Sequence, residues 1–262
     1  MIPGGYKAWL FKPLLGRGAR ASMDRARLEE TIERVRLLLE AVSRGEYCCL
    51  RFGLPFVTPS LLASQVFCEK KLEYTLINEH DPGARRISEA RKLVEVLFEA
   101  KRRISRHTDT FALSIPVAAV VEGVPIIARP HAVYFDAGRV AAIVVGKISA
   151  KPWRMYGSDK VKLYAYALTL AYAGFPLTSR TKLILAAAED NRKLIGILSS
   201  VDLNSVKPIA DNGAALHVLV HDLDAELEAI SPLLAYWREE RKPTARRGSW
   251  CTRCPYYGSC YA

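Results

Sequence analysis

The chain reads VPIIARPHAVYFDAGRVAAIVVGK from residue 124 to residue 147, and this stretch indicates the fold most directly. Two apolar runs, residues 124–135 and 139–147, flank Asp136-Ala-Gly138, a sequence typical of a hairpin turn. A third apolar run, residues 114–121, precedes them across a Glu-Gly turn. We therefore predict three consecutive strands in the middle of the chain.

Helical patterns lie on both sides of these strands, with apolar residues recurring every three or four positions. The predicted helices span residues 23–43, 58–72, 84–107, 158–173 and 223–241. Thr58-Pro59 supplies an N-cap and an early proline for the second helix, which would contain Cys68. Further strands are predicted at residues 50–53, 181–188 and 192–200. This order predicts an α/β core with a mixed sheet and a helical N-terminal part.

Three regions follow from this order. Residues 1–57 form an N-terminal helical and extended segment, residues 58–240 form the core, and residues 241–262 form a C-terminal cysteine loop. The chain has 262 residues, half of them apolar, and no apolar run long enough to cross a membrane. Residues 1–21 lack the apolar centre of a secretory signal, so we expect a soluble cytoplasmic protein.

The charge of the chain points to a polyanionic partner. Lys and Arg total 38 against 27 acids, a net charge of +11. Residues 139–193 carry ten basic and three acidic residues, and residues 238–253 carry six and two. A cationic surface of this size favours nucleic acid. The alternative is a generally basic protein with a solvated face.

Six cysteines are present, and three of them form the compact pattern C-x2-C-x5-C at Cys251, Cys254 and Cys260. Three thiolates do not complete a four-thiolate site, and Cys68 is the best fourth ligand. Cys48 and Cys49 are adjacent in sequence and are interpreted as packed apolar thiols. An iron–sulfur cluster, zinc and disulfides all remain open on spacing alone.

These cysteines carry the first part of a family resemblance. The second part is IARPHAVYFDAG at residues 127–138, VVGK at residues 144–147 and KLYAY at residues 162–166. From Thr58 to its C-terminus the chain resembles the CRISPR-associated RecB-like nucleases, the Cas-four family of the PD-(D/E)xK superfamily. The resemblance implies a restriction-endonuclease-like core. It also implies an iron–sulfur cluster, [4Fe–4S] rather than [2Fe–2S], on the four cysteines at positions 68, 251, 254 and 260.

The same resemblance implies a nuclease site that this sequence has largely lost. Family members hold Mg²⁺ or Mn²⁺ with an Asp and a Glu on neighbouring strands, and hard cations of this kind require carboxylate oxygens. His131 stands at the Asp position and Val145 at the Glu position, while Lys147 of the motif is kept. Lys162 replaces a Gln and Tyr166 is kept. Val94 stands where a helical His is expected.

Two interpretations of this site remain open. In the first, the protein is a pseudo-nuclease with Lys147, His131, Lys162 and Tyr166 as a relic. In the second, His131 binds a metal together with nearby acids, and Mg²⁺ or Mn²⁺ is a cofactor. The candidate acids are Glu122, Asp136 and Glu189.

Smaller features near this site also have two interpretations. Lys147 and Lys162 either flank a phosphate or lie on opposite faces with buried stems. Tyr164 and Tyr166 are interpreted as packing residues. Trp153, which has basic neighbours, either stacks on an unpaired base or anchors its loop.

Three functions are therefore considered. The first is a DNA-binding iron–sulfur protein of CRISPR spacer acquisition, with single-stranded or end-bearing DNA and the integrase complex as partners and with lost or weakened nuclease activity. The second is an active metal-dependent 5′-to-3′ single-stranded DNA exonuclease. The third is a non-catalytic structural subunit whose metal centre only stabilises the fold by linking distant parts of the chain.

Overall fold

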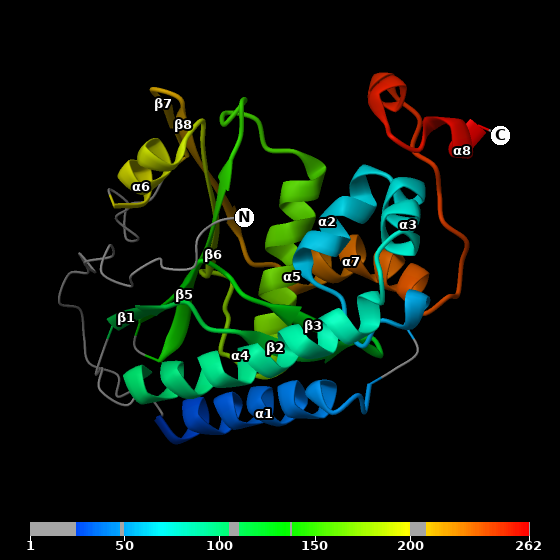
Figure 1. Ribbon diagram of the computed structural model, residues 1–262. Helices are drawn as coiled ribbons and strands as arrows, with labels where there is room; N and C mark the ends of the chain where they lie inside the picture. Colours follow the sequence, from blue (N-terminus) through cyan, green and yellow to red (C-terminus); the bar gives the residue numbers. More distant parts are fainter. Residues whose placement is uncertain (1–24, 48–49, 105–109, 137, 200–207, 262) are drawn as a thin grey trace.

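The computed structural model describes residues 25–47, 50–104, 110–136, 138–199 and 208–261. Its helices precede, connect and follow two sheets (Figure 1). The α-helices are α1 (Arg25–Ser43), α2 (Pro59–Phe67), α3 (Glu69–Ile77), α4 (Pro82–Ile104), α5 (Gly157–Ala173), α6 (Asn191–Ser199), α7 (Leu223–Trp237) and α8 (Tyr257–Tyr261). The short 3₁₀ helices are η1 (Arg51–Gly53) and η2 (Ser249–Arg253). The strands are β1 (Thr110–Leu113), β2 (Val117–Val121), β3 (Val124–Ala128), β4 (Ala132–Asp136), β5 (Arg139–Ile148), β6 (Lys182–Ala188), β7 (Ile209–Asp211) and β8 (Ala214–Val220).

The main sheet is mixed and has six strands in the order β1-β4-β5-β6-β8-β7. Only the β5–β6 pair is parallel, and α5 makes the crossover between these two strands. The other pairs are antiparallel, and β2 and β3 form a separate two-stranded sheet. The predicted α/β class with a mixed sheet is therefore confirmed.

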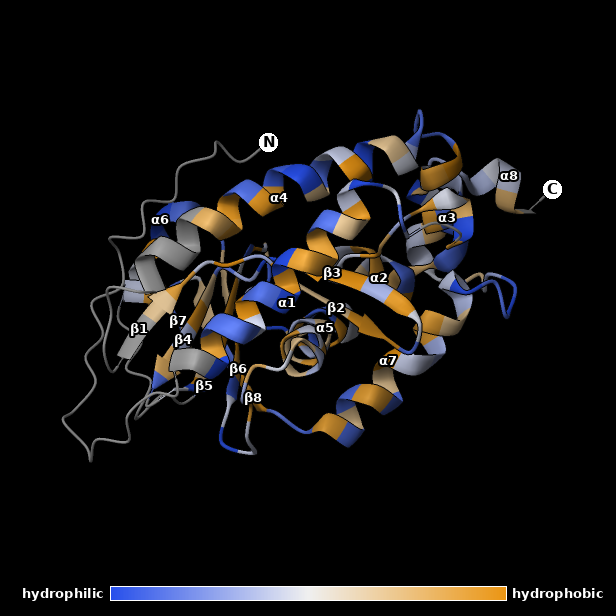
Figure 2. Cartoon of the chain, turned by 90° about the horizontal axis from the view of Figure 1, so that it is seen from below, coloured by the Kyte–Doolittle hydropathy of each residue, from blue (hydrophilic) through white to orange (hydrophobic). Residues whose placement is uncertain are grey.

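Helix α5 is the centre of the larger apolar core. It lies between the main sheet and helices α2 and α7 (Figure 1) and also packs on β2. Eleven of its 17 residues are buried, ten of them between Val161 and Ala173, so its apolar surface runs around most of the helix, as expected of a core helix. In Figure 2, α1 and α4 run side by side, and α1 packs on β2. Apolar residues of α1 belong to the same core cluster as α5, α7 and the sheet.

The opposite face of the main sheet is covered by α6, where the sequence predicted a strand at residues 192–200. That prediction is wrong. Leu194, Ile197 and Leu198 follow a helical repeat and pack on β5, β6 and β8. Asp190 provides the N-terminal cap, since its carboxylate accepts a hydrogen bond from the Lys193 N–H at 2.8 Å.

The predicted strand at residues 124–135 is also wrong in its continuity. The structure divides it into β3, which pairs with β2, and β4, which pairs with β1 and β5. The break falls at Arg129-Pro130-His131, where proline has no N–H to donate to a ladder. The three predicted strands therefore do not form one meander, and β1, β7 and β8 were not predicted.

Residues 50–53 do not form the predicted strand. Leu50 makes an isolated bridge with Leu54, and η1 occupies the residues between them, with Phe52 at a positive φ of 64°. The helices predicted at residues 84–107 and 158–173 are confirmed as α4 and α5 over the described residues. Within the described ranges, no helix combines the length and the apolar character needed to span a bilayer.

Candidate functional sites

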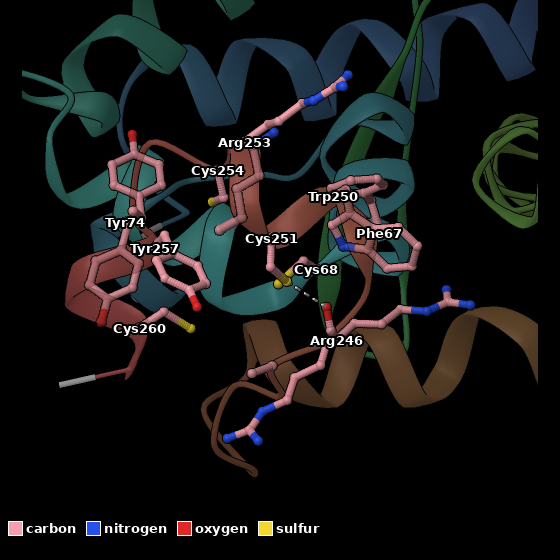
Figure 3. Close-up of a pocket in the computed structure, with 14 residues that line it drawn as sticks. Phe67, Cys68, Tyr74, Arg246, Trp250, Cys251, Arg253, Cys254, Tyr257 and Cys260 are labelled. Carbon is pink, nitrogen blue, oxygen red and sulfur yellow. Dashed lines mark hydrogen bonds between the residues drawn. The ribbon is translucent and has the colours of Figure 1, made fainter.

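A pocket of about 210 Å³ lies between the α2–α3 region and the C-terminal tail, and four cysteines line it (Figure 3). They are Cys68, Cys251, Cys254 and Cys260. All four thiols are half-buried and none is in a disulfide. We call this site the cysteine pocket. Cys48 and Cys49, interpreted above as packed thiols, lie outside the described residues.

Cys68 separates α2 from α3 rather than lying inside one helix as predicted. Its backbone is extended, with φ −170° and ψ 116°. Its N–H still donates to the carbonyl of Ser64, and its carbonyl accepts from the N–H of Leu72. The backbone hydrogen bonds of α2 and α3 are therefore kept on both sides of Cys68. This one non-helical residue turns the chain and places the Cys68 side chain beside the tail.

The tail presents its thiols from a 3₁₀ helix and a short α-helix. The Gly248 N–H donates to Sγ of Cys251 at 3.4 Å, and the Cys254 N–H donates to the carbonyl of Cys251 at 2.9 Å. The Cys251 thiol donates in turn to the carbonyl of Arg246 at 3.9 Å. Two hydrogen bonds therefore fix the position of this sulfur beside the pocket.

A buried carboxylate fastens this tail to the body of the protein. The Glu69 side chain is 6% exposed and pairs with the Arg241 guanidinium. It also accepts hydrogen bonds from the Thr244 N–H and the Gln65 amide, both at 2.7 Å. Burial raises the pKa of Glu69, but the bonds from Arg241, Gln65 and Thr244 outweigh it and lower the pKa below its ordinary value. Trp237 completes this network by donating from Nε1 to Oε1 of Gln65 at 2.8 Å.

Aromatic contacts close the pocket on two sides. The rings of Phe67 and Trp250 lie 5.6 Å apart, and those of Tyr74 and Tyr256 stack at 5.4 Å. The Tyr74 hydroxyl donates to the carbonyl of Ser259 at 2.8 Å. Each pair joins α2 or α3 to the tail, so the pocket is formed by two segments that lie far apart in the sequence.

The residues that line the pocket suit a thiolate-bound centre by their chemistry. Four cysteines line it, and so do four cations: Lys71, Arg246, Arg247 and Arg253. Positive neighbours lower the cost of gathering several thiolates. Among the residues that the structure describes, no three His, Cys, Asp or Glu side chains are grouped as they are around a single metal ion.

The second site lies where β4, β5 and α5 meet. We call it the cationic cluster and define it as Arg129, His131, Lys147, Asp159 and Lys162. His131 immediately precedes β4, and its Nδ1 accepts a hydrogen bond from the Gly146 N–H at 3.1 Å. Lys147 and Asp159 form an ion pair of 2.6 Å between β5 and the first turn of α5.

Electrostatics show that the cations of this cluster are close neighbours. Burial away from water lowers the pKa of His131, and the charges of Lys162 and Arg129 lower it further. Burial also lowers the pKa of Lys162; Asp159 opposes this shift, while Lys147 adds to it. Lys147 and Lys162 are therefore near enough for their charges to interact, and Asp159 interacts with both.

Asp159 is the residue that sequence reasoning missed. It caps α5 by accepting from the Tyr156 N–H at 2.9 Å, and the same Oδ2 accepts from Lys147. The Asp159 carboxylate therefore lies between Lys147 and α5. One of the two expectations for Lys147 and Lys162 was that they flank a bound phosphate. Acidic residues are common in the first turn of a helix because they interact favourably with the helix dipole. The sequence position of Asp159 therefore did not identify it as a site residue.

The other acids considered as metal ligands lie elsewhere. Asp136 is at the far end of β4 from His131. Glu122 follows β2 and pairs with Arg238, which is beyond α7. Glu189 pairs with Lys193 of α6 at 2.6 Å, on the other face of the main sheet. The structure therefore does not bring these three carboxylates around His131.

The remaining predicted site residues are mostly packing residues. Val145 is 1% exposed, and Tyr164 and Tyr166 are buried in the same core. Burial raises the pKa of Tyr166 to about 12, and its hydroxyl donates to the Arg129 carbonyl at 3.4 Å. Val94 packs against the core from α4.

Comparisons with known proteins leave the family open. No family model matches the sequence, and no curated protein shows significant similarity to it. Among solved structures, the crystal structure of SSO0001 aligns over 86% of this chain and 94% of that chain. The sequence identity is 14% and the TM-score 0.37, a likeness too weak to carry an argument.

Proposed function

We propose that this protein is a Cas-four-like iron–sulfur protein that binds DNA during CRISPR adaptation, with a restriction-endonuclease-like core that has lost nuclease activity. One observation carries the proposal: Cys68 lines the same pocket as Cys251, Cys254 and Cys260, although 183 positions separate it from Cys251. The four thiolates would hold a [4Fe–4S] cluster, which would link the α2–α3 region to the C-terminal tail.

Loss of cleavage is inferred from the ligands at the cationic cluster. Mg²⁺ and Mn²⁺ need several hard oxygen ligands to activate water at a phosphodiester. Asp159 is the one carboxylate in the cluster as defined, and Lys147 already neutralises it. An imidazole surrounded by Arg129 and Lys162 binds these cations poorly.

DNA binding is inferred from charge and from the family resemblance. A net charge of +11 favours a polyanion. The resemblance implies single-stranded or end-bearing DNA as the ligand and the integrase complex as the protein partner. In this role the protein would hold DNA ends rather than shorten them.

The cluster is tested by purifying the protein without oxygen. We expect a brown solution with a broad visible absorption band and about four iron and four sulfide per chain. A colourless protein with one zinc per chain would contradict the iron–sulfur assignment.

The role in DNA binding is tested with end-labelled oligonucleotides. We expect binding at low salt without cleavage in Mg²⁺ or Mn²⁺. Robust cleavage that Lys147→Ala abolishes would identify an active exonuclease instead. Failure to bind at low salt, where phosphate contacts are strongest, would favour a purely structural subunit.

A further inference from the structure

We propose that the loop between β5 and α5, residues 149–156, is a stacking platform for an unpaired base of the DNA that the protein holds. This inference rests on the proposed function, since it names the segment that would contact that DNA. In Figure 1 the loop lies at the top of the molecule, where β5 leads into α5.

The central residue of this platform is Trp153, whose side chain is 58% exposed. Pro152, not Trp153, is the buried residue of the loop, and its carbonyl lies 2.8 Å from Nε2 of His217 on β8. The tryptophan therefore does not serve as the anchor of its loop. An indole left open to solvent by a loop that is fastened elsewhere is available to a partner.

The loop is held in shape by its own backbone as well as by β8. The Ser149 N–H donates to the carbonyl of Ala188 at 2.8 Å, which continues the β5–β6 ladder into the loop. The Arg154 N–H donates to the carbonyl of Lys151 at 3.1 Å and closes a turn around Trp153. A fixed loop presents its ring without the entropy cost of ordering on binding.

Cations accompany the aromatic rings along this surface. The Arg154 guanidinium lies 5.0 Å from the centre of the Tyr156 ring, and Nζ of Lys147 lies 5.1 Å from the same centre. Tyr156 is 37% exposed, and Lys151 and Arg154 are exposed. Lys147 belongs to the cationic cluster, so contacts between cations and a ring lead from the cluster through Tyr156 to Arg154, which follows Trp153 in the sequence.

This arrangement favours a single strand over a duplex. From residue 147 to residue 180 the chain has six basic residues and one acid, Asp159, which is already paired. Basic residues follow the phosphates of a strand, while exposed rings stack on bases of any sequence. The bases of a duplex already stack on one another and leave no face for Trp153.

The test uses three labelled ligands of equal length with the purified full-length protein. They are a thymidine oligonucleotide, the same backbone with abasic sites throughout, and a duplex. Fluorescence anisotropy at low salt gives the dissociation constant for each. We expect the thymidine strand to bind most tightly, and Trp153→Ala to weaken its binding by about 5- to 150-fold. The same variant leaves binding to the abasic strand unchanged, and Trp153→Phe restores part of the loss.

The matched control is Tyr172→Ala, which removes an exposed ring, 44% accessible, from the other end of α5 and should change no dissociation constant. Because Trp153 is exposed, Trp153→Ala keeps the wild-type melting temperature. Equal binding of the thymidine strand by wild type and Trp153→Ala overturns the platform and leaves the proposed function intact. Tighter binding of the duplex overturns the preference for a single strand. Failure of wild type to bind any of the ligands overturns the proposed DNA-binding function itself.

Discussion

The cysteine pocket and the cationic cluster differ in what they contain. The pocket has a full set of four thiols and a buried network around Glu69 that positions the tail. The cluster has a comparable scaffold, with α5 capped by Asp159 and Tyr166 packed below it, but it lacks a group of carboxylates. A scaffold can therefore hold a site in shape without supplying its chemistry, and function has to be argued from the donors present.

The largest expected effect comes from breaking the cysteine pocket. Cys254→Ser should abolish the visible absorption and lower the melting temperature by about 10–20 °C. Closing a loop of this length is worth up to about 5 kcal/mol in a chain-entropy model. Calorimetry and absorption spectra of the two proteins check this. Thr252→Ala, in the same turn but outside the pocket lining, should preserve both properties. Unchanged absorption in Cys254→Ser would remove Cys254 from the ligand set.

The next effect separates the pocket from its supporting network. Glu69→Ala leaves the Arg241 guanidinium and the Thr244 N–H without their buried acceptor. We expect a loss of about 3–5 kcal/mol in the free energy of unfolding, measured by urea denaturation. The control is Glu73→Ala on the same helix, which removes a surface ion pair with Lys70 worth less than about 1 kcal/mol. Equal losses in the two variants would show that the network does not hold the tail.

The pH dependence of the unfolding free energy tests the same Glu69 network. Because the folded-state pKa of Glu69 is lowered, its stabilising contribution is complete at neutral pH. That contribution falls away below the ordinary pKa of a glutamate, about 4.3, as the pH drops toward the folded-state value. The difference in unfolding free energy between wild type and Glu69→Gln should therefore shrink in acid. A difference that grows as the pH falls would reverse the sign of this prediction.

The smallest effect concerns the cationic cluster. Lys162→Met removes one of the two cations that lower the pKa of His131. We expect that pKa to rise toward the ordinary value near 6.5, while burial and Arg129 keep it below that value. An NMR titration of the imidazole measures the change. Lys160→Met, an exposed change on the same helix, should leave the His131 titration as it is. An unchanged His131 titration in Lys162→Met would show that the two side chains are not neighbours.

The sequence predicted the long elements of the fold well, because they carry the strongest periodicity. Helices α4 and α5 follow directly from apolar repeats over several turns. Short apolar runs were less informative. Residues 192–200 fit a strand or a helix, and only packing against the main sheet makes Leu194 a residue of α6.

The residues of a candidate site could be predicted where a short spacing pattern in the sequence identifies them. The C-x2-C-x5-C spacing indicated the tail thiols, and Cys68 was chosen by elimination; all four line one pocket. The break between α2 and α3 at Cys68 has no signal in the local sequence, and the next residue, Glu69, contacts a tail that comes more than 170 residues later in the chain. Likewise, the partnership of Lys147 with Asp159 depends on how α5 docks on β5, which local sequence does not encode.

The network around Gln65, the one glutamine of the chain, has a consequence for assembly. It joins α2, α3, α7 and the segment before η2 through protein groups alone. The tail is therefore fastened to the body of the protein by contacts that do not involve the cysteines. If the pocket holds the cluster proposed above, cluster assembly can follow the docking of the tail, as a late step on a folded protein.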